Sequence, residues 1–342
     1  MRYFEQIIRR YEHKRWAAEN NRSGRPFDWG IEHIGGPDGH PDPRAFLDRF
    51  AVETTRSSDL WFAAEPPDDA RLRDEADGKV LTFTSAVRSP WAENNLVWAR
   101  YFPSPGARAA VVVLPQWNAG WDAHAGVCRW LNRFGMSALK MSLPYHDRRA
   151  VGGMYRDNFL VGPNIGLTLQ ANRQAVTDVR RCLRWLERRG YARLGVLGTS
   201  IGSAIACITT AHDPSIRAGA FLHVSTSFGE VVSTGMTTMH VWEPMRAHVS
   251  RDEIRHFWAP ISPYPYAGRL AGSGQKLLMI SGRYDPTFWP EFSEGMFGKV
   301  LESGADLEIL RLPCGHYSLD RPPFSFIAGL RFGAFLRDRL VL

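Results

Sequence analysis

The chain has 342 residues, 44% of them hydrophobic and 12% aromatic, which suffices for a large buried core in one α/β domain with an extension or in two smaller domains. The net charge of +7 comes from arginines scattered along the whole chain without a long basic run, so nucleic acid is not expected as a partner. No apolar stretch is long enough to span a membrane and no apolar signal region is present, so we expect a cytoplasmic protein.

Residues 1–75 are predicted to form a helical N-terminal extension. Within it, residues 1–19 combine basic side chains with an apolar stripe at helical spacing, and residues 44–56 form a second helical pattern after a turn-rich stretch. A basic amphipathic helix can contact an anionic membrane surface, but docking on its own domain or on a second subunit of a homo-oligomer is the favoured interpretation. The apolar stripe consists of Tyr3, Phe4, Ile7, Ile8 and Tyr11.

Residues 76–342 are predicted to form one α/β domain. Apolar, strand-like runs alternate there with helical patterns, which is typical of a doubly wound, mostly parallel sheet. An insertion at about residues 225–274 exceeds ordinary loop length and is rich in Met, Trp, His and Pro, so we expect a cap over a site. The predicted strands are residues 79–89, 95–103, 109–115, 137–143, 194–197, 218–224, 276–281 and 307–312, and the predicted helices are residues 121–134, 167–189, 203–212 and 324–339.

A short motif between a predicted strand and a predicted helix marks a candidate reactive serine. Gly198-Thr199-Ser200-Ile201-Gly202 has the form G-x-S-x-G, in which the flanking glycines allow a sharp bend that presents the serine oxygen above the sheet. Small residues follow in the helix, as close packing at such a turn requires. The alternative interpretation is that Ser200 only caps the helix.

A serine hydroxyl becomes a good nucleophile when a base takes its proton, and a histidine oriented by a carboxylate is the usual base. Asp285 follows a predicted strand that ends at Gly282, and His316 follows the last predicted strand. The order Ser, Asp, His, each just past a strand, is the chain order of the α/β-hydrolase arrangement. Glu230, in the loop after the preceding strand, is the rival carboxylate.

Together these motifs make residues 109–342 similar to an α/β-hydrolase-fold serine hydrolase. The resemblance implies the α/β-hydrolase fold for the catalytic domain, with Ser200 as the nucleophile, His316 as the general base and acid, and Asp285 as the residue that orients it. The backbone N–H of Ile201 would then stabilise the oxyanion. A second N–H would come from the loop after residue 115, where many such enzymes have His-Gly and this chain has Gln116-Trp117-Asn118-Ala119-Gly120, so Trp117 and Asn118 are both candidates.

A second resemblance narrows the family without deciding the substrate. Residues 143–149, 167–203 and 223–235 are similar to a little-studied branch of α/β hydrolases that includes an abhydrolase-domain lipid hydrolase, which implies a lipid-like ester. The histidines show no metal-ligand spacing, and the expected chemistry requires no cofactor, so neither a metal nor a cofactor is predicted.

We therefore expect a serine esterase that cleaves a carboxylic ester or thioester of a hydrophobic acyl or aryl group through an acyl-enzyme. An amidase, a peptidase or a carbon–carbon hydrolase with the same triad remains open, as does a non-catalytic binding protein with this fold. The predicted substrate pocket contains Gln116, Trp121, His146, Arg148, Met236, Trp258 and Phe288.

Overall fold

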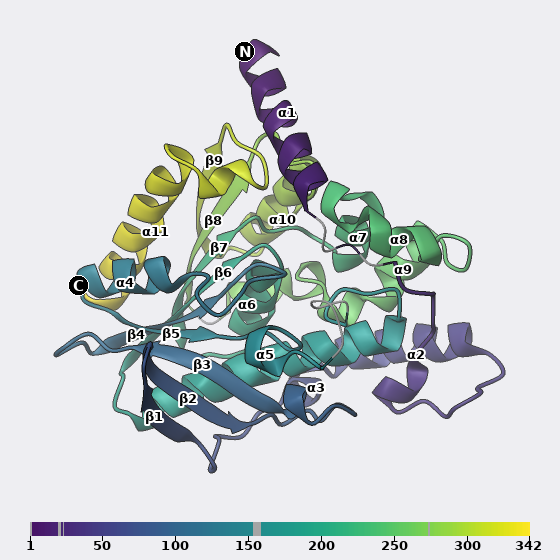
Figure 1. Cartoon of the computed structure of the whole chain (residues 1–342), viewed down its shortest axis with the longest axis horizontal. Coiled ribbons are helices and arrows are strands. Elements are labelled where there is room, and N and C mark those ends of the chain that lie inside the picture. Colours follow the sequence, from purple (N-terminus) through teal and green to yellow (C-terminus); the bar gives the residue numbers. More distant parts are fainter. Residues whose placement is uncertain (1, 20–21, 23, 153–158, 273) are drawn as a thin grey trace.

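Strands β1 to β9 form one nine-stranded sheet in the order β1-β2-β3-β5-β4-β6-β7-β8-β9, in the part of the chain that the computed structural model describes (Figure 1). That part comprises residues 2–19, 22, 24–152, 159–272 and 274–342. Strands β1, β2 and β3 pair antiparallel, and β3 pairs antiparallel with β5, whereas all pairs from β5 to β9 are parallel. The strands are β1 (Arg71–Glu75), β2 (Gly78–Thr84), β3 (Leu96–Phe102), β4 (Ala109–Leu114), β5 (Ser137–Met141), β6 (Arg193–Thr199), β7 (Ile216–Leu222), β8 (Lys276–Gly282) and β9 (Asp306–Leu312).

Helices cover both faces of the sheet, so the predicted doubly wound, mostly parallel architecture is confirmed (Figure 1). Successive side chains of a strand point to opposite faces, and β4 accordingly contributes alternate residues to a core with α5 and α6 and to a core with α4 and α11. The longer helices are α1 (Arg2–Ala18), α2 (Pro43–Arg56), α4 (Ala125–Arg133), α5 (Ile165–Arg188), α6 (Ile201–His212), α10 (Pro290–Glu302) and α11 (Phe324–Leu340).

Two elements of the structure were not anticipated from the sequence. Strand β1 lies in the predicted helical extension but pairs with β2 at the edge of the sheet, so the expectation that the extension is purely helical is wrong there. Its sequence, RLRDE, lacks the apolar alternation by which a half-buried strand is recognised. Helix α10 follows the loop that contains Asp285 and was not predicted; its hydrophobic pattern is interrupted by Gly295 and Gly298.

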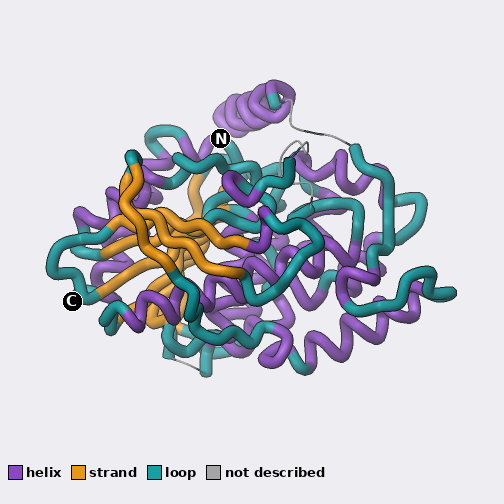
Figure 2. The backbone as a smooth tube through the Cα atoms, turned by 60° about the horizontal axis from the view of Figure 1, so that its bottom comes forward, coloured by secondary structure: helices purple, strands orange, loops and turns teal. Residues whose placement is uncertain are grey.

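The segment between β7 and β8 consists of short helices. It contains α7 (Phe228–Thr234), α8 (Met239–Met245) and α9 (Arg251–Phe257), while α3 (Ser58–Trp61) is a short helix of the N-terminal region. Helix α1 lies at the periphery of the molecule, outside the layers of the domain (Figure 2). Among the described residues, no helix combines the length and apolarity needed to cross a membrane.

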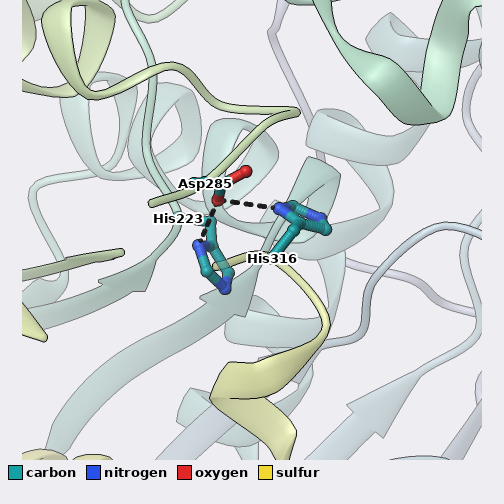
Figure 3. Close-up of side chains that lie close together, drawn as sticks. All are labelled: His223, Asp285 and His316. Atoms are coloured by element: carbon teal, nitrogen blue, oxygen red, sulfur yellow. Dashed lines mark hydrogen bonds and ion pairs between the residues drawn. The ribbon is translucent and has the colours of Figure 1, made fainter. Parts of the chain in front are cut away.

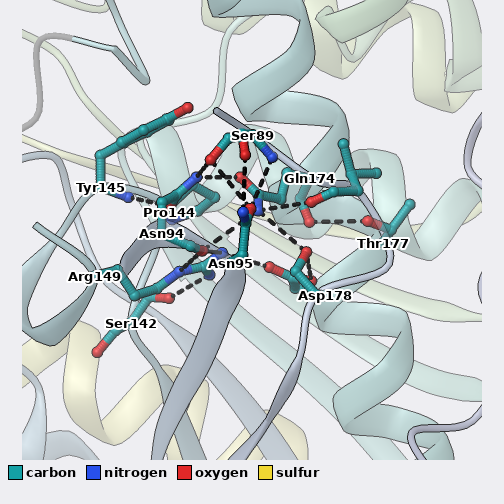
Figure 4. Close-up of polar contacts among 12 residues, drawn as sticks. Ser89, Asn94, Asn95, Ser142, Pro144, Tyr145, Arg149, Gln174, Thr177 and Asp178 are labelled. Carbon is teal, nitrogen blue, oxygen red and sulfur yellow. Dashed lines mark hydrogen bonds and ion pairs between the residues drawn. The ribbon is translucent and has the colours of Figure 1, made fainter. Parts of the chain in front are cut away.

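A buried polar cluster fixes the loop that follows β5 (Figure 4). The side chains of Arg149 and Asp178 are fully buried and form an ion pair at 2.9 Å. Arg149 also donates from Nη2 to the carbonyl oxygen of Asn94 at 2.8 Å, and Asn94 accepts on Oδ1 from the backbone N–H of Tyr145. A buried pair needs such additional hydrogen bonds to offset desolvation, and here they hold residues 142–149 against the body of the domain.

Candidate active site

Ser200 sits in a sharp turn between β6 and α6, as the motif predicts. Its backbone has φ 57° and ψ −123°, a conformation that costs a non-glycine residue about 1–3 kcal/mol. Gly202 allows the bend, because a Cβ there would lie 2.5 Å from the carbonyl oxygens of Leu114 and Pro115. Ser200 makes no side-chain cap to the helix, which rules out the interpretation that it serves only as the helix cap.

The Ser200 hydroxyl begins a chain of hydrogen bonds from the ends of β6, β9 and β8. Its Oγ lies 3.1 Å from Nε2 of His316, and Nδ1 of His316 lies 3.0 Å from Oδ2 of Asp285. A neutral imidazole that donates from Nδ1 to the carboxylate has its Nε2 lone pair free to accept the Ser200 proton. The structure thus brings together the three residues that the sequence singles out.

Asp285, and not Glu230, is the carboxylate that contacts His316. Oδ1 of Asp285 accepts the backbone N–H groups of Thr287 and Phe288 at 2.8 and 2.9 Å, which leaves Oδ2 directed at the imidazole. Burial raises the pKa of Asp285, but the charges and hydrogen bonds of His316 and His223 outweigh burial, and the pKa lies well below its usual range. Glu230 instead accepts a hydrogen bond from Thr226 at 2.6 Å, so the rival assignment is not supported.

The pKa of His316 is raised above its ordinary value. Burial acts to lower it, but the charge and hydrogen bond of Asp285 outweigh burial, and the charges of Glu12 and Asp320 act in the same direction. A histidine that is readily protonated suits a group that must take a proton from a serine and hold it.

A second histidine, His223, contacts the same carboxylate oxygen (Figure 3). Its Nδ1 lies 2.8 Å from Oδ2 of Asp285, its ring centroid is 4.5 Å from that of His316, and the side chain is buried. The sequence did not single out this residue, because it falls inside the predicted strand 218–224, whereas β7 ends at Leu222 and places His223 directly after the strand.

By distance alone, this trio could also hold a cation. The ligand atoms of His223, Asp285 and His316 lie within 4.8 Å of one another. Both ring nitrogens of His316, however, already have partners. Its Nδ1 contacts Oδ2 of Asp285, and its Nε2 contacts Oγ of Ser200. We therefore interpret His223, Asp285 and His316 as a hydrogen-bonded group of titratable side chains and not as a metal site.

The loop after β4 departs from the expectation for Asn118. Its backbone N–H donates to Nε2 of His146 at 3.2 Å, and Nδ1 of His146 lies 2.8 Å from the carbonyl oxygen of Pro144. Burial lowers the pKa of His146 to about 3, so the ring is neutral and can accept on Nε2 while donating from Nδ1. Because that N–H is already bonded, Asn118 is a poor oxyanion donor and the expectation is corrected.

Ser200 lies where two cavities of different character meet. The first has a volume of about 50 Å³ and an almost wholly apolar lining that includes Val231, Val232 and Phe288. The second has a volume of about 380 Å³ and a largely polar lining that includes Gln116, Asn118, His316, Arg15 of α1 and Glu19, directly after α1. Trp117 borders both cavities, and Ile201 borders the apolar one.

Five residues of the predicted pocket border neither of these cavities, which corrects the expectation. Trp258 is fully buried, and its indole N–H donates to the carbonyl oxygen of Ile165; Met236 is also buried, in the segment between β7 and β8. Arg148 forms an ion pair with Glu75 at 2.7 Å, and the indole N–H of Trp121 donates to the carboxylate of Asp77. His146 accepts the backbone N–H of Asn118 and so supports that loop. The abundance of Trp and Met in the segment between β7 and β8 therefore reflects packing as much as a pocket.

Comparison with solved structures places this architecture among known folds. An acetyl xylan esterase from a Thermoanaerobacterium species superposes with a TM-score of 0.61 over 91% of this chain and 99% of its own, at 18% identity. The protein has the α/β-hydrolase fold. An acetyl xylan esterase from a Paenibacillus species superposes with a TM-score of 0.60 over 89% of this chain and 98% of its own, at 15% identity. The acylaminoacyl peptidase of Pyrococcus horikoshii also superposes with a TM-score of 0.60, over 80% of this chain and 42% of its own, at 15% identity.

The sequence matches no protein-family model, and no curated protein is significantly similar to it. At these identities the similarity concerns the α/β-hydrolase fold, and the chemistry has to be argued from the site itself. In this fold a nucleophile occupies the strand-to-helix turn that Ser200 occupies here.

Proposed function

We propose that this protein is a serine esterase that hydrolyses a carboxylic ester with a short apolar acyl group and a polar leaving group. The observation that carries the proposal is the chain of contacts from Ser200 Oγ to His316 Nε2 at 3.1 Å and from His316 Nδ1 to Asp285 Oδ2 at 3.0 Å. Such a chain, beside two cavities, supports nucleophilic catalysis by the serine.

In the proposed reaction, Ser200 Oγ attacks the ester carbonyl carbon while His316 takes the hydroxyl proton. Asp285 stabilises the imidazolium that forms. The tetrahedral intermediate expels the alcohol, which receives the proton from His316, and leaves an acyl group on Ser200. A water molecule, deprotonated by His316, then attacks the acyl-enzyme and releases the carboxylic acid.

The oxyanion of the intermediate needs N–H donors in fixed positions. Ile201 supplies one in this proposal, because it is the first residue of α6 and such an N–H has no acceptor within its own helix. Trp117 is the candidate for the second, since the N–H of Asn118 is bonded to His146 and Trp117 borders both cavities at Ser200.

The two cavities suggest where the acyl group and the alcohol of the ester would each bind. An apolar volume of about 50 Å³ has room for a group of about three or four water-sized atoms, which corresponds to a short acyl chain and narrows the predicted hydrophobic acyl or aryl group. The larger polar cavity suits an alcohol that carries hydroxyl or charged groups. Two of the similar structures are named as esterases of an acetylated polysaccharide, which is compatible with this arrangement.

A fluorophosphonate probe, which reacts covalently with an activated serine, tests the nucleophile. We expect wild-type protein to be labelled, the Ser200→Ala variant not to be labelled, and the Ser303→Ala variant, changed at a remote serine that bonds the Val300 carbonyl, to be labelled like wild type. Absence of labelling in folded wild-type protein contradicts the proposal and favours a non-catalytic binding protein.

A matched substrate panel then tests the bond that is cleaved. Esters, thioesters and anilides with the same acetyl to octanoyl acyl groups should give the highest kcat/KM for short esters. A preference for anilides would instead support an amidase or peptidase, an alternative suggested by the structural similarity to acylaminoacyl peptidase.

A further inference from the structure

Helix α1 projects from the domain, yet its C-terminal half reaches the segment that follows His316 (Figure 1). Glu12, in the middle of this helix, is fully buried. Its Oε2 accepts the backbone N–H of Tyr317 at 2.8 Å, and its Oε1 accepts the backbone N–H of Ser318 at 2.9 Å. Both carboxylate oxygens thus hold the two residues directly after the proposed catalytic base.

The contact also includes the residue before His316. A Cβ on Gly315 would lie 2.5 Å from Cδ of Glu12, so only glycine lets the carboxylate pack this closely on the backbone. One further hydrogen bond ties the helix to this segment, because Arg321 donates from Nε to the hydroxyl of Tyr11 at 3.0 Å. A second involves Glu19, directly after the helix, which accepts from the hydroxyl of Tyr317 at 2.9 Å.

Glu12 forms no ion pair with any residue that the structure describes, and its partners are backbone N–H groups. Burying a carboxylate without a cation is costly, and α1 already has an apolar anchor in Ile8, which belongs to the buried core cluster that also contains residues of α11. Attachment of the helix therefore does not by itself require a carboxylate at position 12. What the carboxylate adds is two hydrogen bonds that fix the backbone directly after His316, and a negative charge near its ring.

We propose that Glu12 is a positioning residue for His316, so that α1 is part of the active site. This inference rests on the proposed function. Glu12 holds the His316 loop so that Nε2 stays within reach of Ser200 and Nδ1 stays on Asp285. Among the described residues, Asp285, His223, Asp320 and Tyr317 are further titratable groups near His316. Arg15 of α1 and Glu19, directly after α1, border the same cavity.

The test compares three full-length variants by steady-state kinetics on a short-chain ester across pH. Glu12→Gln keeps the shape but removes the charge and turns one acceptor into a donor that faces an N–H group. Glu12→Asp keeps the charge but is one methylene too short to reach both N–H groups. Glu5→Gln is the matched control, because Glu5 lies on the same helix and forms an ion pair with Arg9 at 2.9 Å, away from the His316 segment.

We expect Glu12→Gln to lower kcat by about tenfold to a hundredfold with a smaller change in KM, because small displacements of a catalytic group act mainly on the chemical step. Since kcat/KM requires neutral His316, loss of a nearby negative charge should move the acid limb of its pH profile to lower pH. Glu12→Asp should lower kcat less than Glu12→Gln does and should leave the acid limb of the pH profile unchanged. Glu5→Gln should match wild type in both respects.

Wild-type kcat and an unmoved acid limb in folded Glu12→Gln would overturn the inference, even if the fluorophosphonate probe still labels Ser200. If Glu12→Gln does not fold, as judged by circular dichroism, Glu12→Asp decides, and wild-type kcat in that variant overturns the inference equally. Failure of the proposed function looks different, because wild-type protein itself would then neither be labelled nor hydrolyse any ester.

Discussion

The imidazole of His223 and the carboxylate of Asp285 are in direct contact, with Nδ1 of the histidine 2.8 Å from Oδ2 of the aspartate. The same oxygen lies 3.0 Å from Nδ1 of His316. Asp285 is therefore held by two histidines and two backbone N–H groups, which leaves its carboxylate little freedom to rotate away from His316.

Replacing His223 by Asn should lower kcat/KM by about tenfold, since the lost contact to a charged group is worth ~1.5 kcal/mol. Asn is chosen because it tolerates the positive φ of 58° at this position. The exposed His248, changed to Asn, serves as the control and should leave kcat/KM as in wild type. Equal kinetics for both variants would show that His223 does not support Asp285.

Enlarging the apolar cavity should change the acyl preference. Val231→Ala removes two methyl groups from the cavity lining, so the best acyl chain should lengthen by one or two carbons, at a cost of about 2 kcal/mol in stability. Val249→Ala removes the same groups from a buried position that does not border this cavity, so it should lose similar stability without a change in preference. An unchanged chain-length profile in Val231→Ala would place the acyl group elsewhere.

Stability should fall as the pH decreases from about 6.5, the ordinary histidine pKa, to about 4, the pKa of His124. Burial lowers the pKa of His124 to about 4 and that of His146 to about 3, so the unfolded chain binds protons that the folded chain refuses. Each group then removes up to about 1.4 kcal/mol per pH unit. The raised pKa of His316 acts in the opposite direction, because that group contributes stability at low pH.

Urea unfolding at pH 7.5, 6 and 5 checks this dependence. His124→Asn, which suits the positive φ of 62°, should flatten the pH dependence, whereas His248→Asn should not. A profile that is as steep in His124→Asn as in wild type would remove His124 as a cause.

The buried ion pair between Arg149 and Asp178 should matter far more than an exposed one. Arg149→Met leaves a buried carboxylate without its partner and should cost about 3–5 kcal/mol of unfolding free energy. Arg311→Met removes the pair with Glu294, whose side chains are 39% and 48% exposed, and should cost no more than about 1 kcal/mol. Equal urea midpoints for the two variants would contradict the assigned role of the cluster.

Local patterns in the sequence determined the sheet, the turn at Ser200 and the chain order of Ser200, Asp285 and His316, because strand periodicity, glycines and strand ends are properties of short segments. The same patterns missed β1, whose polar residues form a strand only because β2 pairs with them. The abundance of Trp and Met also led to the prediction of Trp258 as a pocket residue, although its side chain is buried in the core. Composition alone does not distinguish a side chain that packs inward from one that borders a cavity.

Only the tertiary structure decided which residues surround the three candidate catalytic groups. Glu12 meets Tyr317 across 305 positions of the chain, and His223 meets Asp285 from a different strand. His146 accepts the N–H of Asn118, and residues of α6 and α7, which lie far apart in the sequence, line the same apolar cavity. Such contacts depend on how distant segments pack, and no pattern within a single segment carries that information.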